Sequence, residues 1–439
     1  MKKIILFILL LNIVTVFSDY SYLTPPFTSV MTTGADIPVG YRYPSAAGFT
    51  RNDTGWIYTF GGLTDGSVIS SSVYRYNIKT NTWNLETNLP DGGFWISAAA
   101  RIGNKLYNIG GTYTTALNQC QPRVKIYDVN TGTWSSGTSM PYGRCFHAVT
   151  AYQDSIIYSA GGWGYPGGVT YNDIYLYNAI SDSWRPATNM PAPRSSGVLA
   201  VCNDTLVYVC GGPEWYNPSA LSTIFRGVVS QSDRSVITWD SSGQVYPGGV
   251  RNSIYGASWG SKGVIVSGGY QVSQATNQVY VYSSGRNQWT QQPNMTIIRT
   301  DHGSASVNIG NIWKFVMVSG TSNRSSTNST SVNILTDTIF FVPVKQNGTV
   351  IPEEFSLSQN YPNPFNPITV IKYEVPVESK VNISVYNSLG VLIETLFDGN
   401  SKPGVYAVNF NVEKLSSGVY FCRLISGDVN RTIKMMLVK

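Results

Sequence analysis

Short runs in which apolar and polar residues alternate recur through most of this chain, and the clearest runs end in a pair of glycines. Alternation with a period of two is typical of β-strands that bury one face. Five glycine pairs and one weaker copy follow one another at intervals of about 50 residues, which indicates a repeat. They are Gly61–Gly62, Gly110–Gly111, Gly161–Gly162, Gly211–Gly212, Gly268–Gly269 and the weaker Ser319–Gly320.

A second marker follows most of the glycine pairs, namely an aromatic strand, a short turn and a tryptophan. Tyr76 with Trp83 and Tyr127 with Trp134 are clear examples. The pattern predicts one four-stranded antiparallel sheet per repeat, with glycine where the backbone bends and aromatic side chains between neighbouring sheets. Because such a sheet cannot shield both of its faces alone, we expect the sheets to stack around an axis.

Hydrophobic runs, double glycine, spaced tyrosines and tryptophan together resemble the kelch repeat. The resemblance implies an all-β fold, a six-bladed kelch-type β-propeller over residues 19–344, with seven blades as the alternative. Propellers of this type usually close by taking a strand from one end of the chain. Residues 26–38 look like an orphan outer strand, and the last repeat lacks its tryptophan strand. We therefore expect residues 26–38 to complete the last blade.

The pattern changes after residue 344. A polar linker, 345–354, leads into a proline-rich opening and then into alternating runs separated by short turns such as Ser388–Gly390. Alternation of this kind over 355–439 predicts a small C-terminal antiparallel β-sandwich.

This tail resembles the type A sorting domain of the type IX secretion system. The resemblance covers the Tyr386–Gly390 and Leu415–Tyr420 segments, the Lys-Met-x-Leu-Val-Lys ending and an opening motif. The motif consists of Tyr361, Pro362, Asn363, Pro364, Phe365, Asn366 and Pro367. It implies that the type IX secretion machinery reads residues 355–439, cuts near 343–355 and delivers the protein to the medium or cell surface of a Gram-negative bacterium. An ordinary adhesive sandwich is the alternative.

The first 18 residues predict a secretory signal peptide. Lys2 and Lys3 precede a short apolar stretch, and cleavage before Asp19 would follow a small residue. After signal removal we expect no transmembrane segment, since no later run is long and apolar enough. The net charge of +6 is spread along the chain without a basic stripe, so we expect no nucleic-acid partner.

Five cysteines remain, and an exported chain permits disulfides. The odd number leaves at least one thiol unpaired, and the spacings fit no zinc pattern, so we expect no metal and no cofactor. Cys202 should face Thr205 across a hairpin rather than pair with Cys210. The simplest interpretation is that the cysteines are buried small residues, with the pairing left open.

Four arginines recur near the start of successive repeats, and two of them are followed three residues later by a histidine. The set comprises Arg144, Arg194, Arg251 and Arg299 with His147 and His302, and Arg42 occupies a similar place before the first repeat. One hypothesis is a cationic rim for an acidic or sugar ligand. The alternative is that each arginine bonds carbonyls and turns within the repeat.

Aromatic residues outside the repeat pattern suggest a second group of ligand contacts. Trp163 and Trp215 follow the third and fourth glycine pairs, and Glu214 is a polar neighbour of Trp215. Aromatic rings in loops can stack on carbohydrate, although they can equally pack the loop.

These features favour, over an enzyme, an exported interaction module that binds a glycan or protein through one propeller face. The alternative is a propeller enzyme acting on a sugar acid, similar to a sialic acid mutarotase, with Glu214 and one of the arginines in the channel. A fragment of a larger surface protein is a third class. Asp-box and paired-carboxylate patterns of glycosidases are not recognisable in the repeats.

Overall fold

The structure is a computed structural model that describes residues 29–337 and 352–438 apart from short gaps. The gaps are 53, 117–118, 154, 166–167, 203, 214–219, 241–243, 261–262, 272–273, 284–286, 310–311, 323–326, 367, 402 and 412–414. The expected signal peptide and nearly all of the expected linker lie outside the described residues. The chain forms two compact units, with the first spanning residues 27–338.

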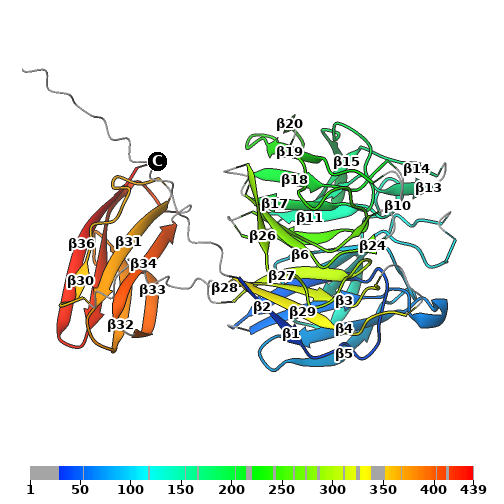
Figure 1. Cartoon of the computed structure of the whole chain (residues 1–439). Coiled ribbons are helices and arrows are strands. Elements are labelled where there is room, and N and C mark those ends of the chain that lie inside the picture. The colour runs from blue at the N-terminus through cyan, green and yellow to red at the C-terminus, as the bar shows by residue number, and fades with distance from the viewer. Residues whose placement is uncertain are drawn as a thin grey trace, which may run out of the picture. The chain divides into compact units, whose positions relative to one another are not determined.

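The first unit contains six four-stranded antiparallel sheets in its described part, numbered here as blades in chain order (Figure 1). Blade one consists of β2 (Ser45–Arg51), β3 (Thr54–Phe60), β4 (Ser72–Asn77) and β5 (Thr82–Asn88). Blade two consists of β6 (Ala98–Ile102), β7 (Lys105–Ile109), β8 (Val124–Asp128) and β9 (Thr133–Gly137). Blade three consists of β11 (Ala148–Tyr152), β12 (Ile156–Ala160), β15 (Ile174–Asn178) and β16 (Ser183–Ala187).

Blades four to six repeat this order. Blade four consists of β17 (Val198–Cys202), β18 (Thr205–Val209), β19 (Ile224–Val229) and β20 (Ile237–Asp240). Blade five consists of β21 (Tyr255–Ser258), β22 (Val264–Ser267), β25 (Val279–Ser283) and β26 (Gln288–Gln292). Blade six consists of β27 (Gly303–Ile309), β28 (Ile312–Val318), β29 (Val332–Asp337) and β1 (Ser29–Gly34).

Short elements lie in the loops that follow the second strands, together with β10, which precedes the first strand of blade three. They are the 3-10 turn η1 (Asp65–Ser67), β10 (Gly143–Cys145) with β13 (Trp163–Tyr165) and β14 (Val169–Thr170), and β23 (Tyr270–Gln271) with β24 (Gln274–Ala275).

The first strands of the six blades contact one another in a closed cycle. β2 contacts β6, and the cycle continues through β11, β17, β21 and β27 back to β2. These strands therefore surround the propeller axis, and the all-β kelch-type propeller expected from the repeat is confirmed.

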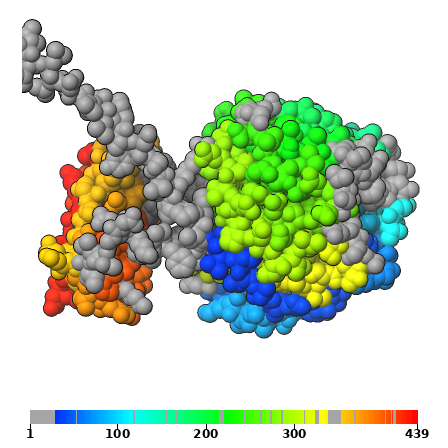
Figure 2. Space-filling model, in the orientation of Figure 1, coloured from blue at the N-terminus to red at the C-terminus, as the bar shows by residue number. Residues whose placement is uncertain are grey.

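The N-terminal strand closes the last blade. β1 pairs antiparallel with β29 from Ser29 opposite Asp337 to Gly34 opposite Val332. Figure 2 shows the dark-blue residues of β1 against the yellow residues of the last blade. The pairing covers the outer edge of β29, which would otherwise present unpaired backbone groups.

The glycine pairs tie each blade to the next. The amide of the second residue of a pair, or of the first residue in the Gly211–Gly212 pair, donates to a carbonyl in the segment leading into the following blade, for example Gly62 to Phe94 at 2.8 Å. The series continues Gly111 to Arg144, Gly162 to Arg194, Gly211 to Arg251, Gly269 to Arg299 and Gly320 to Tyr41, which completes the circle. A Cβ on Gly61, whose φ is +57°, would lie 2.1 Å from the Phe94 oxygen, so glycine is required there.

The tyrosine and tryptophan of each repeat meet across neighbouring strands. Tyr76 lies opposite Trp83 with ring centroids 4.9 Å apart, and Tyr177 lies opposite Trp184 at the same distance. The tryptophans also reach the preceding blade, since Trp184 Nε1 donates to the Thr138 carbonyl at 2.8 Å. This confirms the expectation that aromatic side chains fill the space between blades.

The second unit contains a two-sheet β-sandwich. One sheet has the order β30 (Ser356–Leu357), β31 (Ile368–Val375) and β34 (Gly404–Asn411). The other has the order β33 (Leu392–Ser401), β32 (Ser379–Asn387), β35 (Gly418–Ser426) and β36 (Val429–Leu437). Side chains of both sheets, including Tyr373, Phe410, Leu424 and Met435, share one buried core. The sequence pattern predicted these strands except β30 and β33.

Candidate functional site

A cavity of about 120 Å³ lies on the propeller axis where the first strands of the blades begin. All six blades contribute to its wall, and the polar side chains include Ser45, Ser97, Ser196, Ser253 and Ser304. His147 is the only histidine among the described lining residues, and none of these residues carries a carboxylate, ammonium or guanidinium group. We call this end of the channel the mouth and the space the channel cavity.

A ring of left-handed residues shapes the mouth. One residue directly before or near the start of each first strand has φ between +47° and +58°; the six are Tyr43, Ile96, Phe146, Ser196, Ser253 and Asp301. Neighbouring members are hydrogen-bonded through their backbones, for example Ile96 N to Tyr43 O at 3.3 Å and Tyr43 N to Asp301 O at 2.7 Å. The strained backbone is therefore held from both sides, and each ring residue places the next side chain beside the channel.

Arg144 and Arg194 are buried and bonded inside their own blades. The Arg144 guanidinium lies 3.7 Å from the Tyr171 ring centroid and 2.6 Å from a carboxylate oxygen of Asp173. Burial raises the pKa of Asp173, while the positive charge of Arg144 opposes this rise. Arg194 donates to Thr223 Oγ1 at 2.9 Å.

Arg251 and Arg299 are likewise buried and bonded inside their own blades. Arg251 donates to the Gln271 side chain and to the Val250 carbonyl. Arg299 is completely buried and donates to the carbonyls of Met317, Ser319 and Ser331, with distances of 2.9–3.2 Å. Burial lowers the pKa of both arginines.

None of the four arginines is among the described residues that line the channel cavity. In blades one and two, Tyr41 and Phe94 accept the glycine hydrogen bond at the corresponding position, so Arg42 is one residue out of phase. The arginines therefore sit beneath the mouth, with their guanidinium groups directed to partners in the blades.

The two histidines occupy equivalent positions but differ in their partners. His147 is 6% exposed, lines the channel cavity and has no hydrogen-bond partner on either ring nitrogen among the described residues. His302 Nε2 lies 2.9 Å from Ser267 Oγ. Burial, reinforced by the charge of Arg144, lowers the pKa of His147 to about 3, and burial with Arg299 lowers the pKa of His302 well below its usual value.

Apolar side chains gather on the mouth over blades one to three. Trp163 packs there with the mouth cluster, which comprises Tyr43, Leu63, Ile69, Trp95, Ile96, Cys120, Cys145 and Phe146. Tyr43 meets Trp95 and Phe146 edge-on, each at 5.6 Å. Tyr113 and Tyr142 are each about half exposed, at 49% and 51%. The other two residues of this prediction, Glu214 and Trp215, lie outside the described residues.

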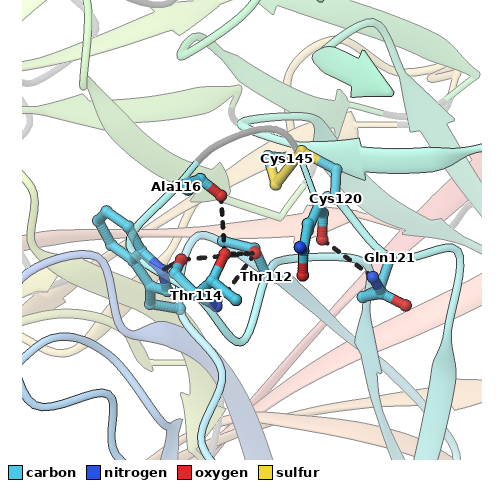
Figure 3. The surroundings of a disulfide bond; sticks show 8 residues. Thr112, Thr114, Ala116, Cys120, Gln121 and Cys145 are labelled. Carbon is cyan, nitrogen blue, oxygen red and sulfur yellow. Dashed lines mark hydrogen bonds between the residues drawn. A yellow bond between two sulfur atoms is a disulfide. The ribbon is translucent and has the colours of Figure 1, made fainter. Parts of the chain in front are cut away.

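A disulfide bonds Cys120 to Cys145 inside the mouth cluster (Figure 3). It joins the loop after β7 to β10, where blade three begins. The loop is also held by Thr114 Oγ1, which donates to the Ala116 carbonyl at 2.8 Å. Cys202, Cys210 and Cys422 are buried and form no disulfide, and Cys202 faces Thr205 as expected. The interpretation of all five as simple buried residues is thus wrong for Cys120 and Cys145.

A polar network that the sequence pattern did not reveal leads from the surface to the channel cavity. Asp91 lies 3.6 Å from Arg123, which donates to Asn108 Oδ1 at 2.6 Å. Asn108 Nδ2 donates to Ser45 Oγ at 2.8 Å and to Ser97 Oγ at 2.9 Å. The signal in the sequence is small: an asparagine stands in the otherwise apolar β7, before a glycine pair.

The sorting motif is partly buried in the sandwich. The Phe365 side chain belongs to the core, and its amide donates to the Met436 carbonyl at 2.9 Å. Asn363 Oδ1 accepts from the Met436 amide at 2.8 Å, and Tyr361 is 71% exposed. Pro362, Pro364 and Asn366 are also exposed, while Pro367 lies outside the described residues.

The described residues also exclude two other features from this part of the chain. They contain no group of three or more histidine, cysteine or acidic side chains placed to hold a metal ion. They also contain no helix long and apolar enough to cross a membrane.

Comparisons with known proteins agree with this architecture. Residues 27–225 match the KLHDC2/KLHL20/DRC7 Kelch-repeats domain, residues 264–296 match the Kelch motif, and residues 359–439 match the Secretion system C-terminal sorting domain. The solved structure titled "Structure of YjhT" superposes with a TM-score of 0.54 over 68% of this chain and 95% of that chain. At 14% sequence identity, this likeness shows the fold alone.

Curated relatives match a shorter stretch. Kelch-like protein 25 of Xenopus tropicalis and of Homo sapiens are each 32% identical to this chain over 108 residues. That stretch is 25% of this chain and 17% of those proteins, so the match spans about a sixth of the curated relatives.

Fold and repeats together define an all-β kelch-repeat propeller protein. More particularly, the chain is an exported kelch-repeat protein with a C-terminal sorting domain of the type IX secretion system. This sorting domain indicates secretion to the surface or the medium of a Gram-negative bacterium, with the type IX machinery as a partner.

Proposed function

We propose that the propeller is an interaction module that binds a glycan or protein at the mouth of its channel. The observation that carries the proposal is the coincidence of the mouth cluster with the channel cavity. Exposed aromatic rings offer stacking surfaces, and the hydroxyl-lined cavity beside them offers hydrogen bonds. Ligands of propellers and other scaffolds commonly bind where loops meet at one face.

Two exposed tyrosines of blades two and three, Tyr113 and Tyr142, support this binding surface. Tyr113 lies 6.0 Å from Phe94, and the Arg144 guanidinium lies 5.7 Å from the Tyr142 ring. Both rings are therefore backed by buried groups, which limits their side-chain freedom before a ligand arrives. A preordered aromatic ring loses less entropy on binding than a free one.

The experiment is a glycan array and a pull-down of surface and medium proteins, both with the full secreted chain. We expect a specific ligand whose binding weakens about tenfold or more in Tyr142→Ala, which is the range for an aromatic contact at an interface. The matched control is Ile180→Ala, since Ile180 is 85% exposed in the turn between β15 and β16. Absence of any specific glycan or protein ligand would contradict the proposal.

The same preparation tests the enzyme alternative. An enzyme acting on a sugar acid would need an acid–base residue and a cation at the ligand, and the four arginines are bonded within the blades. Interconversion of sialic acid anomers faster than in buffer, followed by NMR and lost in Glu214→Gln, would replace binding by catalysis as the function.

A further inference from the structure

We propose that the channel cavity binds a single neutral sugar residue, held by the hydroxyl groups of Ser45 and Ser97. This inference rests on the proposed binding function and gives it a chemical class and a position. Two independent features of the cavity carry it: the direction of its hydrogen bonds, and its size and charge.

Arg123 fixes the direction of the hydrogen bonds. A guanidinium group only donates, so the atom of Asn108 that lies 2.6 Å from Arg123 Nη2 must be the amide oxygen. The amide nitrogen of Asn108 then faces Ser45 and Ser97, and its two hydrogens are both used in the bonds to their oxygens. Asn108 therefore acts toward the serines only as a donor.

One serine hydrogen remains for a ligand. The two serine oxygens lie 3.2 Å apart, so one hydroxyl donates to the other. The second hydroxyl hydrogen has no acceptor within hydrogen-bond distance in the part of the chain that the structure describes. Since both serines line the channel cavity, this hydrogen is available there to an acceptor group of a ligand.

His147 closes the wall of the cavity from blade three. Its ring packs against Gly110, where a Cβ would lie 2.5 Å from His147 Cε1, and it lines the same cavity. The depressed pKa keeps the ring neutral at physiological pH, so one nitrogen donates and the other accepts. Both ring nitrogens are buried, so a ligand in the cavity lies beside the ring and does not bond to its nitrogens. A sugar hydroxyl, whose oxygen accepts, matches the remaining serine hydrogen.

The volume of the channel cavity and its uncharged lining suit a neutral sugar ring. A volume of about 120 Å³ holds on the order of ten waters, comparable with the roughly dozen heavy atoms of a hexose. Tyr43 and Tyr255 in the wall offer aromatic surface to the apolar face of a sugar. With no carboxylate, ammonium or guanidinium among the described lining residues, a charged ligand would lose water without gaining a counter-charge.

The test uses the full chain labelled with ¹⁵N-histidine, which contains two histidines only. Glucose, galactose and N-acetylglucosamine are titrated and compared with glucuronate. We expect at least one neutral sugar to shift the imidazole signals of His147, assigned with His147→Gln, while the His302 signals stay in place as an internal reference. Glucuronate should bind more weakly than its neutral counterpart.

Serine variants test the donor network. Ser45→Ala and Ser97→Ala should each weaken binding of the responding sugar about tenfold, and Ser97→Cys, which keeps the volume, should weaken it similarly. The control Ser135→Ala removes an exposed hydroxyl from β9, away from the channel cavity, and should bind nearly as wild type. An unshifted His302 signal verifies that each variant is folded.

Two outcomes would overturn the inference while leaving the proposed function intact. One is a glycan or protein ligand found on the arrays together with no response of His147 to any neutral sugar. The other is unchanged affinity in both serine variants or tighter binding of glucuronate. Absence of every ligand, on the arrays and in the titration, would remove both proposals together.

Discussion

Residues at the same place in successive repeats share a backbone role while their side chains differ. Tyr41, Phe94 and Arg144 each accept a glycine hydrogen bond from the preceding blade through their carbonyl oxygens. Their side chains then fill the blade in different ways: Phe94 lies under the Arg123 guanidinium at 3.5 Å, whereas Arg144 lies over Tyr171. A residue that recurs at the same place in each repeat therefore indicates a shared backbone hydrogen bond, and it does not indicate a shared side-chain function.

Neutral buried histidines make the propeller sensitive to acid. The folded-state pKa values of His147 and His302 lie below the ordinary value of about 6.5 that they regain on unfolding. Above pH 6.5 both states hold these rings neutral. As the pH falls below 6.5 the unfolded state takes up protons first, so the free energy of unfolding decreases, by at most about 1.4 kcal/mol per pH unit for each histidine.

Thermal unfolding followed between pH 7 and pH 4 checks this prediction. His147→Gln should flatten the dependence, because the glutamine amide does not titrate, whereas a variant of an exposed residue, Lys380→Ala, should leave it unchanged. A slope identical in His147→Gln and the native protein would show that this histidine does not contribute.

At the scale of elements, the regular parts of the fold could be predicted and the departures could not. The second strands and the Tyr–Trp pairs are marked by residues that each blade needs. β33 was missed because β32 pairs with it through two register shifts, between Ile383 and Ser384 and between Val385 and Tyr386, which break the alternation. In blade four the glycine pair is shifted by one residue relative to the repeat: Cys210, with φ of +59°, takes the place of the first glycine.

The candidate site was predictable only in its location. The sequence placed Trp163 and His147 near the ends of strands, and the structure brings both to the mouth. It could not reveal that the arginine side chains turn into the blades, or that Arg123 and Asn108 meet, because both depend on side-chain direction within one sheet. The Cys120–Cys145 bond joins positions that are not equivalent in the repeat, so no period pointed to it.

The disulfide should stabilise the propeller chiefly at the junction of blades two and three. Its cysteines are 25 residues apart, for which the loss of chain entropy in the unfolded state corresponds to roughly 3 kcal/mol. The double variant Cys120→Ser with Cys145→Ser should lower the free energy of unfolding by about this amount, as measured by denaturant titration.

Cys422→Ala provides the matched control, since that free cysteine lies in the core of the sandwich and not in the propeller. The same reduction in stability should appear when the native protein is titrated with denaturant under reducing conditions. Equal stability of the oxidised and reduced propeller would contradict the expected contribution.

At the scale of the whole molecule, the two units have separate cores and separate tasks. The sandwich holds its own buried cluster around Tyr373 and Leu424, and the propeller holds clusters between successive blades. Removing residues 352–439 should therefore leave the propeller folded but stop it at the periplasm, because the sorting domain is what the type IX machinery reads.

Cell fractionation with an antibody against the propeller checks this prediction. The expected result is periplasmic accumulation of the truncated chain with a thermal transition like that of the native propeller. The control is Lys380→Ala in the intact chain, which alters an exposed side chain of the sorting domain and should be exported normally. Truncated protein appearing in the medium at native levels would contradict it.

The pairing of β1 with β29, which closes the ring, has a consequence for biosynthesis. The two partners lie at opposite ends of the propeller sequence, so a nascent chain keeps an open ring until its final blade has been made. Pairing of segments so distant in sequence is slow. Until β1 pairs, the outer edge of β29 has unpaired backbone groups that can bind other chains. The sorting domain follows β29 in the sequence, so the ring can close and the protein can be exported only after the last part of the chain has been made. Export is thereby coupled to completion of the propeller.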